Sequence, residues 1–182
     1  MKRFFGFILC VALVGFYFAT KPSMWEDGIT LAPNPKNGEY VYFAAGCGGC
    51  HISPDAAEDS KKILSGGQKF SSPFGTFVAP NVSMHVDYGI GAWSQDDFVR
   101  AVRKGVSPDG KHYYPAFPYT SYQGMSDQDV VDLWSYWQTF PSSEQKSQAH
   151  DLPIYAKWRR PLGIWKMMFQ SALDPQMQDA EL

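Results

Sequence analysis

Two of the chain's three cysteines stand in the run Cys47-Gly-Gly-Cys50-His51. This C-x-x-C-H pattern is the attachment signature of a c-type haem. Two thiols at this spacing can add to the two vinyl groups of haem, and the adjacent imidazole can reach the iron as its proximal ligand. Gly48 and Gly49 carry no side chains, which permits close approach of the backbone to the ring. The motif predicts one covalent haem c on Cys47 and Cys50, with His51 as an iron ligand.

Three other uses of a cysteine pair compete with this interpretation. A zinc ribbon needs a second ligand pair of similar spacing, and the chain has no other C-x-x-C. A thioredoxin-like dithiol needs a preceding buried strand, whereas residues 38–46 are typical of a short helix. A structural disulfide between exported cysteines is the third alternative. We favour haem attachment, because such haems are attached outside the cytoplasm and the amino terminus predicts export.

An uncharged run of 17 residues, 4–20, follows Lys2 and Arg3. This length lies at the lower limit of the roughly 17–25 residues that span a bilayer. A cleaved signal peptide is the alternative, but the candidate exit Tyr17-Phe18-Ala19 has an aromatic residue where a small one is expected. The sequence therefore predicts a signal anchor over residues 1–23, a single transmembrane helix in the bacterial inner membrane. Cytoplasmic Lys2 and Arg3 would place the haem domain in the periplasm.

The composition and length of the chain argue against some classes of function. The 182 residues contain 16 Lys and Arg against 18 Asp and Glu, without a basic cluster. Nucleic-acid binding therefore has no support, because its electrostatic signature is a basic patch. The length suits one ordinary domain with additions and argues against a multi-domain enzyme. We expect a haem domain over residues 24–140 and a C-terminal extension over residues 141–182.

The methionines and the remaining histidines are the candidates for a second iron ligand. Met125 directly precedes a predicted helix with Ser126 as its N-cap, and a large apolar side chain there needs a surface such as haem to pack on. Met125 is therefore the predicted distal ligand, although a methionine is more often a core gap-filler. Met84 and His85 are the runners-up. The remaining candidates are His112, which we expect to be solvated in a polar turn, His150, Met167 and Met168.

Helical signals predict a mostly α fold. Ser94 is expected to begin a helix that runs through Lys104 and stops at Gly105. A further helix is predicted from Ser126 to Phe140.

The last of these helices carries an apolar stripe at helical spacing. We expect the stripe to pack on Tyr40 and Phe43 of the first helix and so to close the fold from its two ends. The long Gly- and Pro-rich loop over residues 51–93 is expected to wrap the flat cofactor, with at most a minor hairpin. The stripe consists of Val130, Leu133, Trp134 and Trp137.

Several short stretches, which cover about residues 36–140, are together far more specific than the cysteine motif. They read Gly66-Gly-Gln-Lys-Phe, Pro73-Phe-Gly-Thr76, Ala79-Pro-Asn81, Gly89-Ile-Gly-Ala-Trp-Ser94, Asp97-Phe-Val-Arg100, Tyr114-Pro-Ala-Phe-Pro-Tyr119 and Met125-Ser-Asp. In these stretches the chain resembles class I c-type cytochromes. The resemblance is closest to haem domains of the cytochrome c subunits of membrane-bound alcohol, gluconate and sorbitol dehydrogenases.

The resemblance implies a class I cytochrome c fold with His51 and Met125 as axial iron ligands. It also implies that the carbonyl of Pro80 accepts the Nδ1 proton of His51 and orients the ring. Weaker partners of the haem propionates are Trp93, Arg100 and Tyr114. Two features depart from the family. Its subunits usually carry three haem domains, whereas this chain has one C-x-x-C-H, and residues 82–85 differ from the usual Ile-Thr-Pro-Asp type.

The C-terminal extension is similar to the linkers that follow haem domains in that family. Its aromatic and basic side chains could form a strap over the chain's own domain, or a docking or membrane-surface face. Both alternatives stay open. The residues concerned are Lys157, Trp158, Arg159, Arg160, Leu162, Trp165, Lys166, Met168 and Phe169.

These observations predict a membrane-anchored monohaem cytochrome that is not itself an enzyme. It would pass electrons from a periplasmic dehydrogenase to quinone or a terminal oxidase, as a subunit of a larger complex in the respiratory chain. One alternative is a haem-based sensor or ligand-binding module with a labile distal site. The other is a structural, membrane-tethered partner in a respiratory assembly.

Overall fold

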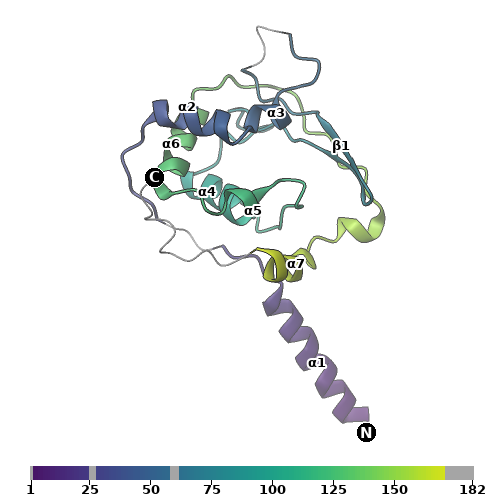
Figure 1. Ribbon diagram of the computed structural model, residues 1–182. Coiled ribbons are helices and arrows are strands. Elements are labelled where there is room, and N and C mark those ends of the chain that lie inside the picture. Colours follow the sequence, from purple (N-terminus) through teal and green to yellow (C-terminus); the bar gives the residue numbers. More distant parts are fainter. Residues whose placement is uncertain (1, 25–27, 58–61, 171–182) are drawn as a thin grey trace.

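Short helices joined by long loops make up the structure, a computed structural model that describes residues 2–24, 28–57 and 62–170 (Figure 1). This mostly helical composition is as predicted. The end of the predicted extension, residues 171–182, lies outside the described residues. In chain order the elements are α1 (Lys2–Ala19), α2 (Pro35–Ala44), α3 (Cys47–His51), β1 (Lys69–Ser72), β2 (Gly75–Val78), α4 (Gln95–Lys104), α5 (Tyr119–Tyr122), α6 (Asp127–Trp137), the 3-10 helix η2 (Ile154–Lys157) and α7 (Leu162–Phe169).

Helices α2 and α6 cross at close range and join the two ends of the haem domain. A Cβ atom on Gly38 would lie 2.0 Å from the carbonyl oxygen of Asp132, so the crossing requires glycine. The buried carboxylate of Asp132 accepts hydrogen bonds from the Asn34 backbone N–H at 2.7 Å and from the Asn37 side-chain amide at 2.9 Å. The expected packing of the first helix on the last one is confirmed.

The face of α2 that packs on α6 is not the expected one. Tyr40 and Phe43 are 73% and 68% exposed, whereas Val41 and Tyr42 are buried in the core. Because Gly38 must face α6, the residues three and four positions later share its side of the helix. Those residues are Val41 and Tyr42, so Tyr40 and Phe43 are turned away from the core.

Local capping signals fix the boundaries of α4 where the sequence predicts them. The hydroxyl of Ser94 accepts the Asp97 N–H at 3.1 Å, and the Asp97 carboxylate accepts the Ser94 N–H at 3.1 Å. This reciprocal pair is a capping box. The helix stops at Gly105, which adopts a left-handed conformation with φ of 59°.

Helix α6 begins as predicted and ends early. Ser126 caps it by accepting the Asp129 N–H at 3.1 Å. Its last residue is Trp137, three residues before the predicted end at Phe140. The whole predicted stripe is buried in the core: Val130, Leu133, Trp134 and Trp137.

The described part of the long loop between α3 and α4 contains one hairpin, in agreement with the expectation of a minor one. Strands β1 and β2 pair antiparallel, with Phe70 opposite Phe77. After α6, the extension runs back along this hairpin. Thr76 and Asp151 form an isolated β-bridge with backbone hydrogen bonds of 2.8 and 2.9 Å. The hairpin is therefore covered by a segment that is distant in sequence.

The end of α1 is fixed to the extension and to the turn that carries His112. Arg160 donates to the hydroxyl of Thr20 at 2.9 Å and to the carbonyl of Tyr17 at 2.6 Å. His112 Nε2 lies 3.0 Å from the carbonyl oxygen of Thr20. The His112 side chain is buried by these long-range contacts, so the expectation of a solvated histidine is wrong.

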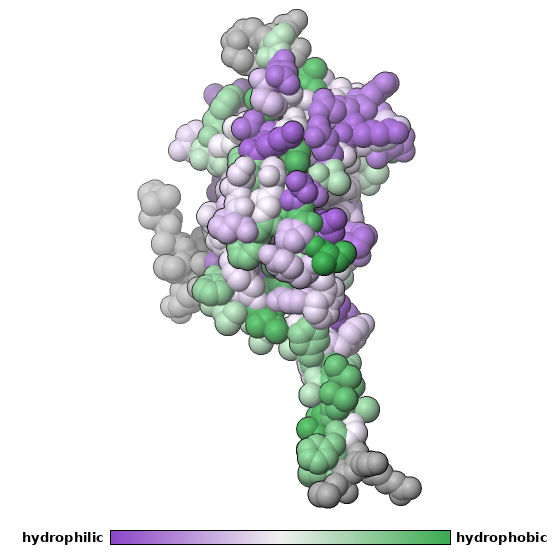
Figure 2. Space-filling model, turned by 90° about the vertical axis from the view of Figure 1, so that its right-hand side faces the viewer, coloured by the Kyte–Doolittle hydropathy of each residue, from purple (hydrophilic) through white to green (hydrophobic). Residues whose placement is uncertain are grey.

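Within the described residues, none of the helices combines the length and hydropathy needed to cross a membrane. Helix α1 has 18 residues and begins with Lys2 and Arg3, which leaves 16 uncharged residues. At about 1.5 Å per residue these span about 24 Å, less than the ~30 Å hydrocarbon core of a bilayer. The predicted transmembrane helix over residues 1–23 is therefore wrong, and so is the single-pass inner-membrane localisation based on it. Figure 2 shows α1 as a hydrophobic projection with exposed apolar side chains.

The side chain of Lys166, in α7, contacts the C-terminal end of α4. Its ammonium group donates to the carbonyls of Lys104 and Gly105, the second at 2.8 Å, and lies 4.6 Å from the centre of the Tyr119 ring. Cations at this end of a helix satisfy carbonyls that lack intrahelical partners. Burial lowers the pKa of Lys166 to about 8.

The close crossing of α2 and α6 predicts that Gly38→Ala destabilises the protein. The added methyl group must displace the Asp132 backbone, and overpacking of this kind costs about 1–3 kcal/mol. Urea denaturation should therefore show a lower midpoint. Gly15→Ala is the matched control, because a Cβ atom there meets nothing within 4 Å. Equal midpoints for the two variants would contradict the crossing.

The lowered pKa of Lys166 predicts a stability that rises with pH. An unfolded lysine has a pKa of about 10.4, so between pH 8 and 10 the unfolded chain binds more protons at this position than the folded protein does. The free energy of unfolding then increases over this interval. Urea denaturation at several pH values should give a steeper increase for the wild type than for Lys166→Met. Parallel pH profiles would show that Lys166 keeps its ordinary pKa.

Candidate functional site

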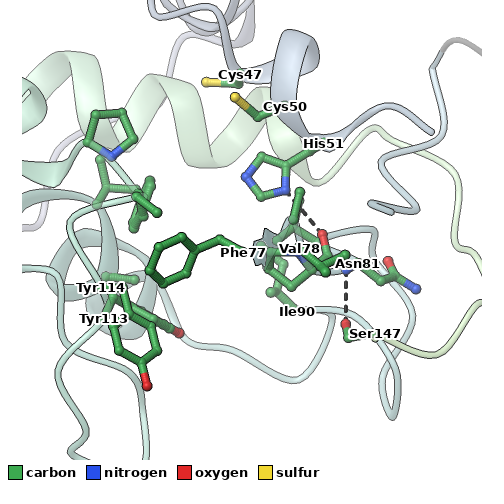
Figure 3. Close-up of a pocket in the computed structure, with 18 of the residues that line it drawn as sticks. Cys47, Cys50, His51, Phe77, Val78, Asn81, Ile90, Tyr113, Tyr114 and Ser147 are labelled. Carbon is green, nitrogen blue, oxygen red and sulfur yellow. Dashed lines mark hydrogen bonds between the residues drawn. The ribbon is translucent and has the colours of Figure 1, made fainter. Parts of the chain in front are cut away.

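Helix α3 is a single turn that presents both cysteines and the histidine at one cavity. Residues three apart on a helix lie on the same side, and Figure 3 shows the sulfurs of Cys47 and Cys50 close together, with the His51 ring below them. Gly46 makes the turn from α2 into α3 with φ of 68°, a conformation that suits glycine. Neither thiol is in a disulfide.

The two glycines between the cysteines have different surroundings. A Cβ atom on Gly48 would lie 2.6 Å from the hydroxyl oxygen of Tyr42, so this position packs against α2. A Cβ atom on Gly49 would meet nothing within 4 Å. Gly48 is therefore required by the protein's own packing, and close approach of both glycines to a haem stays a prediction.

The environment of the thiols disfavours the other uses of a cysteine pair. Burial, together with a smaller effect of the neighbouring Cys50, raises the pKa of Cys47 to about 12. A catalytic dithiol depends on a depressed thiol pKa, so this pair is not arranged as a redox dithiol. In the part of the chain that the structure describes, His, Cys, Asp and Glu nowhere gather in threes to hold a metal ion. A zinc ribbon therefore has no ligand set there.

His51 is held by a backbone carbonyl. Its Nδ1 lies 3.1 Å from the carbonyl oxygen of Pro80. Because a carbonyl oxygen only accepts, Nδ1 carries the proton and Nε2 keeps its lone pair. Burial lowers the pKa of His51, and the bond to Pro80 offsets this in part. The ring is thus a neutral, oriented imidazole, which is the form that ligates a metal.

Gly66 brings the histidine and its partner together. Its N–H donates to the carbonyl of His51 at 2.7 Å. With φ of 75°, it passes so close to the next segment that a Cβ atom would lie 2.5 Å from the Pro80 carbonyl oxygen. A glycine is required here both by the backbone conformation and by the contact. Gly66 therefore positions the carbonyl that orients His51.

Below α3 lies a cavity of about 670 Å³. Its size falls in the range of about 300–1,000 Å³ that is typical of ligand and cofactor sites. The wall consists mainly of apolar and aromatic side chains, with the two thiols and the histidine among them. A flat apolar cofactor that is attached through thioethers fits this arrangement. The predicted site residues in the wall are Cys47, Cys50, His51, Pro80, Trp93, Tyr114 and Met125.

The runners-up for the distal ligand do not contribute to the wall. Nδ1 of His85 accepts the backbone N–H groups of Asp87 at 3.1 Å and Tyr88 at 3.2 Å, and its ring stacks on Tyr88 with centroids 4.8 Å apart. Met84 packs against the core. The geometry therefore favours Met125 over both.

Arg100, one of the predicted propionate partners, is also absent from the wall. Its side chain is 4% exposed and forms an ion pair with Asp97. Its Nε atom has no hydrogen-bond partner among the described residues. The structure gives no support to Arg100 as a lining residue of the haem pocket.

Sequence reasoning did not assign the C-terminal extension to the cavity wall, although it kept a strap as one of two alternatives. Residues of the C-terminal extension line this wall, and Figure 3 shows the backbone N–H of Asn81 bonded to the Ser147 hydroxyl beside the cavity, at 2.9 Å. No local spacing signals this contribution, because the extension reaches the cavity only through long-range pairing. The lining residues from this segment are Ser147, Gln148, Ala149, His150, Leu152, Lys157 and Arg159.

Comparison with known families agrees with the geometry. The family model described as cytochrome c matches residues 35–141, which is more than half of the chain. The chain belongs to the cytochrome c family. This confirms the resemblance on which the predicted fold was based, and membership implies covalent haem c.

Several curated relatives show which kinds of cytochrome the chain is similar to. The chain is 44% identical over 76% of its length to a "Diheme cytochrome c-type" protein of Cereibacter sphaeroides, of which it covers 47%. It is 35% identical over 85% of its length to the fructose dehydrogenase cytochrome subunit of Gluconobacter japonicus, and 34% identical over 79% to the gluconate 2-dehydrogenase cytochrome c subunit of Pantoea cypripedii. The chain spans 31% and 32% of those two relatives. Their names mark them as cytochrome subunits of dehydrogenases.

The position of Gly66 predicts that Gly66→Ala disturbs the His51–Pro80 bond. Strain at positive φ costs about 1–2 kcal/mol, and displacement of the Pro80 carbonyl adds about 1–3 kcal/mol. Gly28→Ala is the control, since Gly28 has φ of 60° but a Cβ atom there meets nothing within 4 Å.

Urea denaturation should therefore show a larger loss of stability for Gly66→Ala than for Gly28→Ala. The NMR signal of the His51 ring N–H should also shift in the first variant alone. If both variants lose the same stability and leave that signal in place, Gly66 has no part in positioning Pro80.

Proposed function

We propose that this chain is a monohaem electron carrier, with one haem c attached to Cys47 and Cys50 and with His51 and Met125 as axial ligands. The observation that carries the proposal is that these four side chains lie in the wall of one largely apolar cavity. The single C-x-x-C-H of the sequence supports one haem, although a relative is named as a dihaem protein.

The bound haem supplies an iron that cycles between Fe(III) and Fe(II). The protein's residues then have distinct tasks. His51 would offer Nε2 to the iron while Pro80 holds Nδ1, and Met125 would be the second protein ligand, which would leave the iron no free site for a substrate. A methionine ligand raises the reduction potential relative to a more basic ligand.

The segment that carries Met125 is held by buried contacts. Arg103 is 8% exposed and donates through Nη2 to the Met125 carbonyl at 2.7 Å. Through Nη1 it pairs with Asp127 at 2.7 Å, at the start of α6. The Met125 N–H donates to the carbonyl of Tyr122 at 3.0 Å. These bonds support a fixed ligand rather than a labile distal site, and so favour the electron carrier over the sensor.

The relatives suggest the partner. Several of them are named as cytochrome subunits of fructose, gluconate and alcohol dehydrogenases. We therefore propose a dehydrogenase as the electron donor and quinone or a terminal oxidase of the respiratory chain as the acceptor. The chain would act as the electron-transfer subunit of such a complex.

Two methionine variants test the proposal. Wild-type protein should be low-spin and show the near-infrared band of a methionine–iron bond. Met125→Leu should lose that band, have a lower reduction potential and bind carbon monoxide when reduced, because the axial position is vacated. Met84→Leu is the matched control and should keep the band.

Each outcome decides between functions. Loss of the band in Met84→Leu but not in Met125→Leu would assign the ligand to Met84. A high-spin ferric wild type that binds carbon monoxide rapidly would show the sensor to be correct and the electron carrier wrong.

A further inference from the structure

Among the described residues, the charged side chains in the cavity wall are basic, and they come from the C-terminal extension. Within residues 2–24, 28–57 and 62–170, no Asp or Glu lines the cavity, and the two charged residues that do so are Lys157 and Arg159. Both belong to the C-terminal extension. A largely apolar cavity with two cations in its wall is suited to a ligand that is apolar and also carries negative charge.

Arg159 lies at the end of the cavity that is far from the cysteines. Figure 3 places Cys47 and Cys50 at one end and Tyr113 and Tyr114 at the other. The Arg159 guanidinium lies over the Tyr114 ring, 4.6 Å from its centre. In haem the two propionates are on the opposite edge of the macrocycle from the two vinyl groups. A haem attached through its vinyl groups to the cysteines would therefore direct its propionates toward Arg159.

The N–H donors of the Arg159 guanidinium are not used by hydrogen bonds within the described residues. Among the residues that the structure describes, no carboxylate lies within ion-pair distance of its guanidinium, and no hydrogen bond uses its side chain. A guanidinium carries five N–H donors in a planar fork that matches a carboxylate. By contrast, the Tyr114 hydroxyl already donates to the Ala156 carbonyl at 2.9 Å. Tyr114 thus positions the segment that carries Arg159 and supplies the ring beneath its guanidinium.

The extension is tied to the cavity wall ahead of these cations. The backbone N–H of Val78 donates to Nδ1 of His150 at 3.1 Å. The side-chain amide of the buried Asn81 donates to the carbonyls of Ser143 at 2.9 Å and Gln145 at 2.7 Å. These contacts hold residues 143–150 against the end of β2 and the segment that follows it, next to Pro80. They favour the strap over a docking segment for this part of the extension.

We propose that the C-terminal extension is a strap that completes the haem site, with Arg159 as the bidentate partner of a haem propionate and Lys157 as a second cation beside it. This inference rests on the proposed haem attachment. The sequence predicted Arg100 and Tyr114 as propionate partners. The proposal assigns this role to Arg159 and Lys157 instead, which the sequence placed in a strap or a docking face.

Haem-loaded Arg159→Gln, Arg159→Lys and wild-type protein test the proposal. Loss of the positive charge beside the propionate favours Fe(III), so the midpoint potential of Arg159→Gln should fall. For a unit charge about 10 Å from a redox centre, an effective dielectric constant of about 20 gives a change of roughly 17-fold in the Fe(II)/Fe(III) equilibrium, which is about 70 mV for one electron. The resonance Raman bending mode of the propionates should shift as well. Lys36→Gln in α2 is the charge control, since its side chain is exposed and lies outside the cavity wall.

Arg159→Lys should keep the potential but shift the propionate mode, because lysine retains the charge and loses the fork. If Arg159→Gln does not load haem, the propionate mode of Arg159→Lys decides alone. An unchanged propionate mode in that variant, or an unchanged potential and mode in Arg159→Gln, overturns the assignment. In either case the near-infrared band of the wild type tests the proposed function separately.

Discussion

The hydrogen bond from His51 Nδ1 to the Pro80 carbonyl joins α3 to a segment 29 residues further along the chain. It fixes the tautomer and the direction of the ring, and it gives the Gly-rich loop between them a defined end point. The bond depends on Gly66, which contacts both sides of it. Pro80 in turn precedes Asn81, whose side chain is held by the extension. The orientation of one imidazole thus depends on segments from three separate parts of the chain.

The two proposed iron ligands, His51 and Met125, are supported by separate parts of the fold. The histidine side depends on Gly66, Pro80 and the extension. The methionine side depends on Arg103, which links α4 to the start of α6 through Met125 and Asp127. A site whose ligands are held by buried neighbours changes little in geometry when its charge changes. Such an arrangement suits a carrier that gains and loses electrons without rearranging its ligands.

Features that depend on residues close together in the sequence could be predicted, whereas contacts between distant parts of the chain could not. The capping box of Ser94, the stop at Gly105 and the cap at Ser126 depend on residues a few positions apart, and the structure has them as predicted. The exposed face of α2 was assigned wrongly, because its orientation is set by a contact between Gly38 and Asp132. His112 was expected in solvent for the same reason, since Thr20, which buries it, lies 92 residues away.

Arg159 shows why a haem site of this kind is incompletely predicted from its motif. The motif and the resemblance end at about residue 140, and the family model ends at residue 141. The charged groups of the cavity wall come after that boundary. An apolar cavity can bind a macrocycle through its walls alone, but burial of two carboxylates requires cations or donors nearby. Because the described residues within the motif boundaries place no cation in the wall, the proposed propionate site takes its charge from the extension.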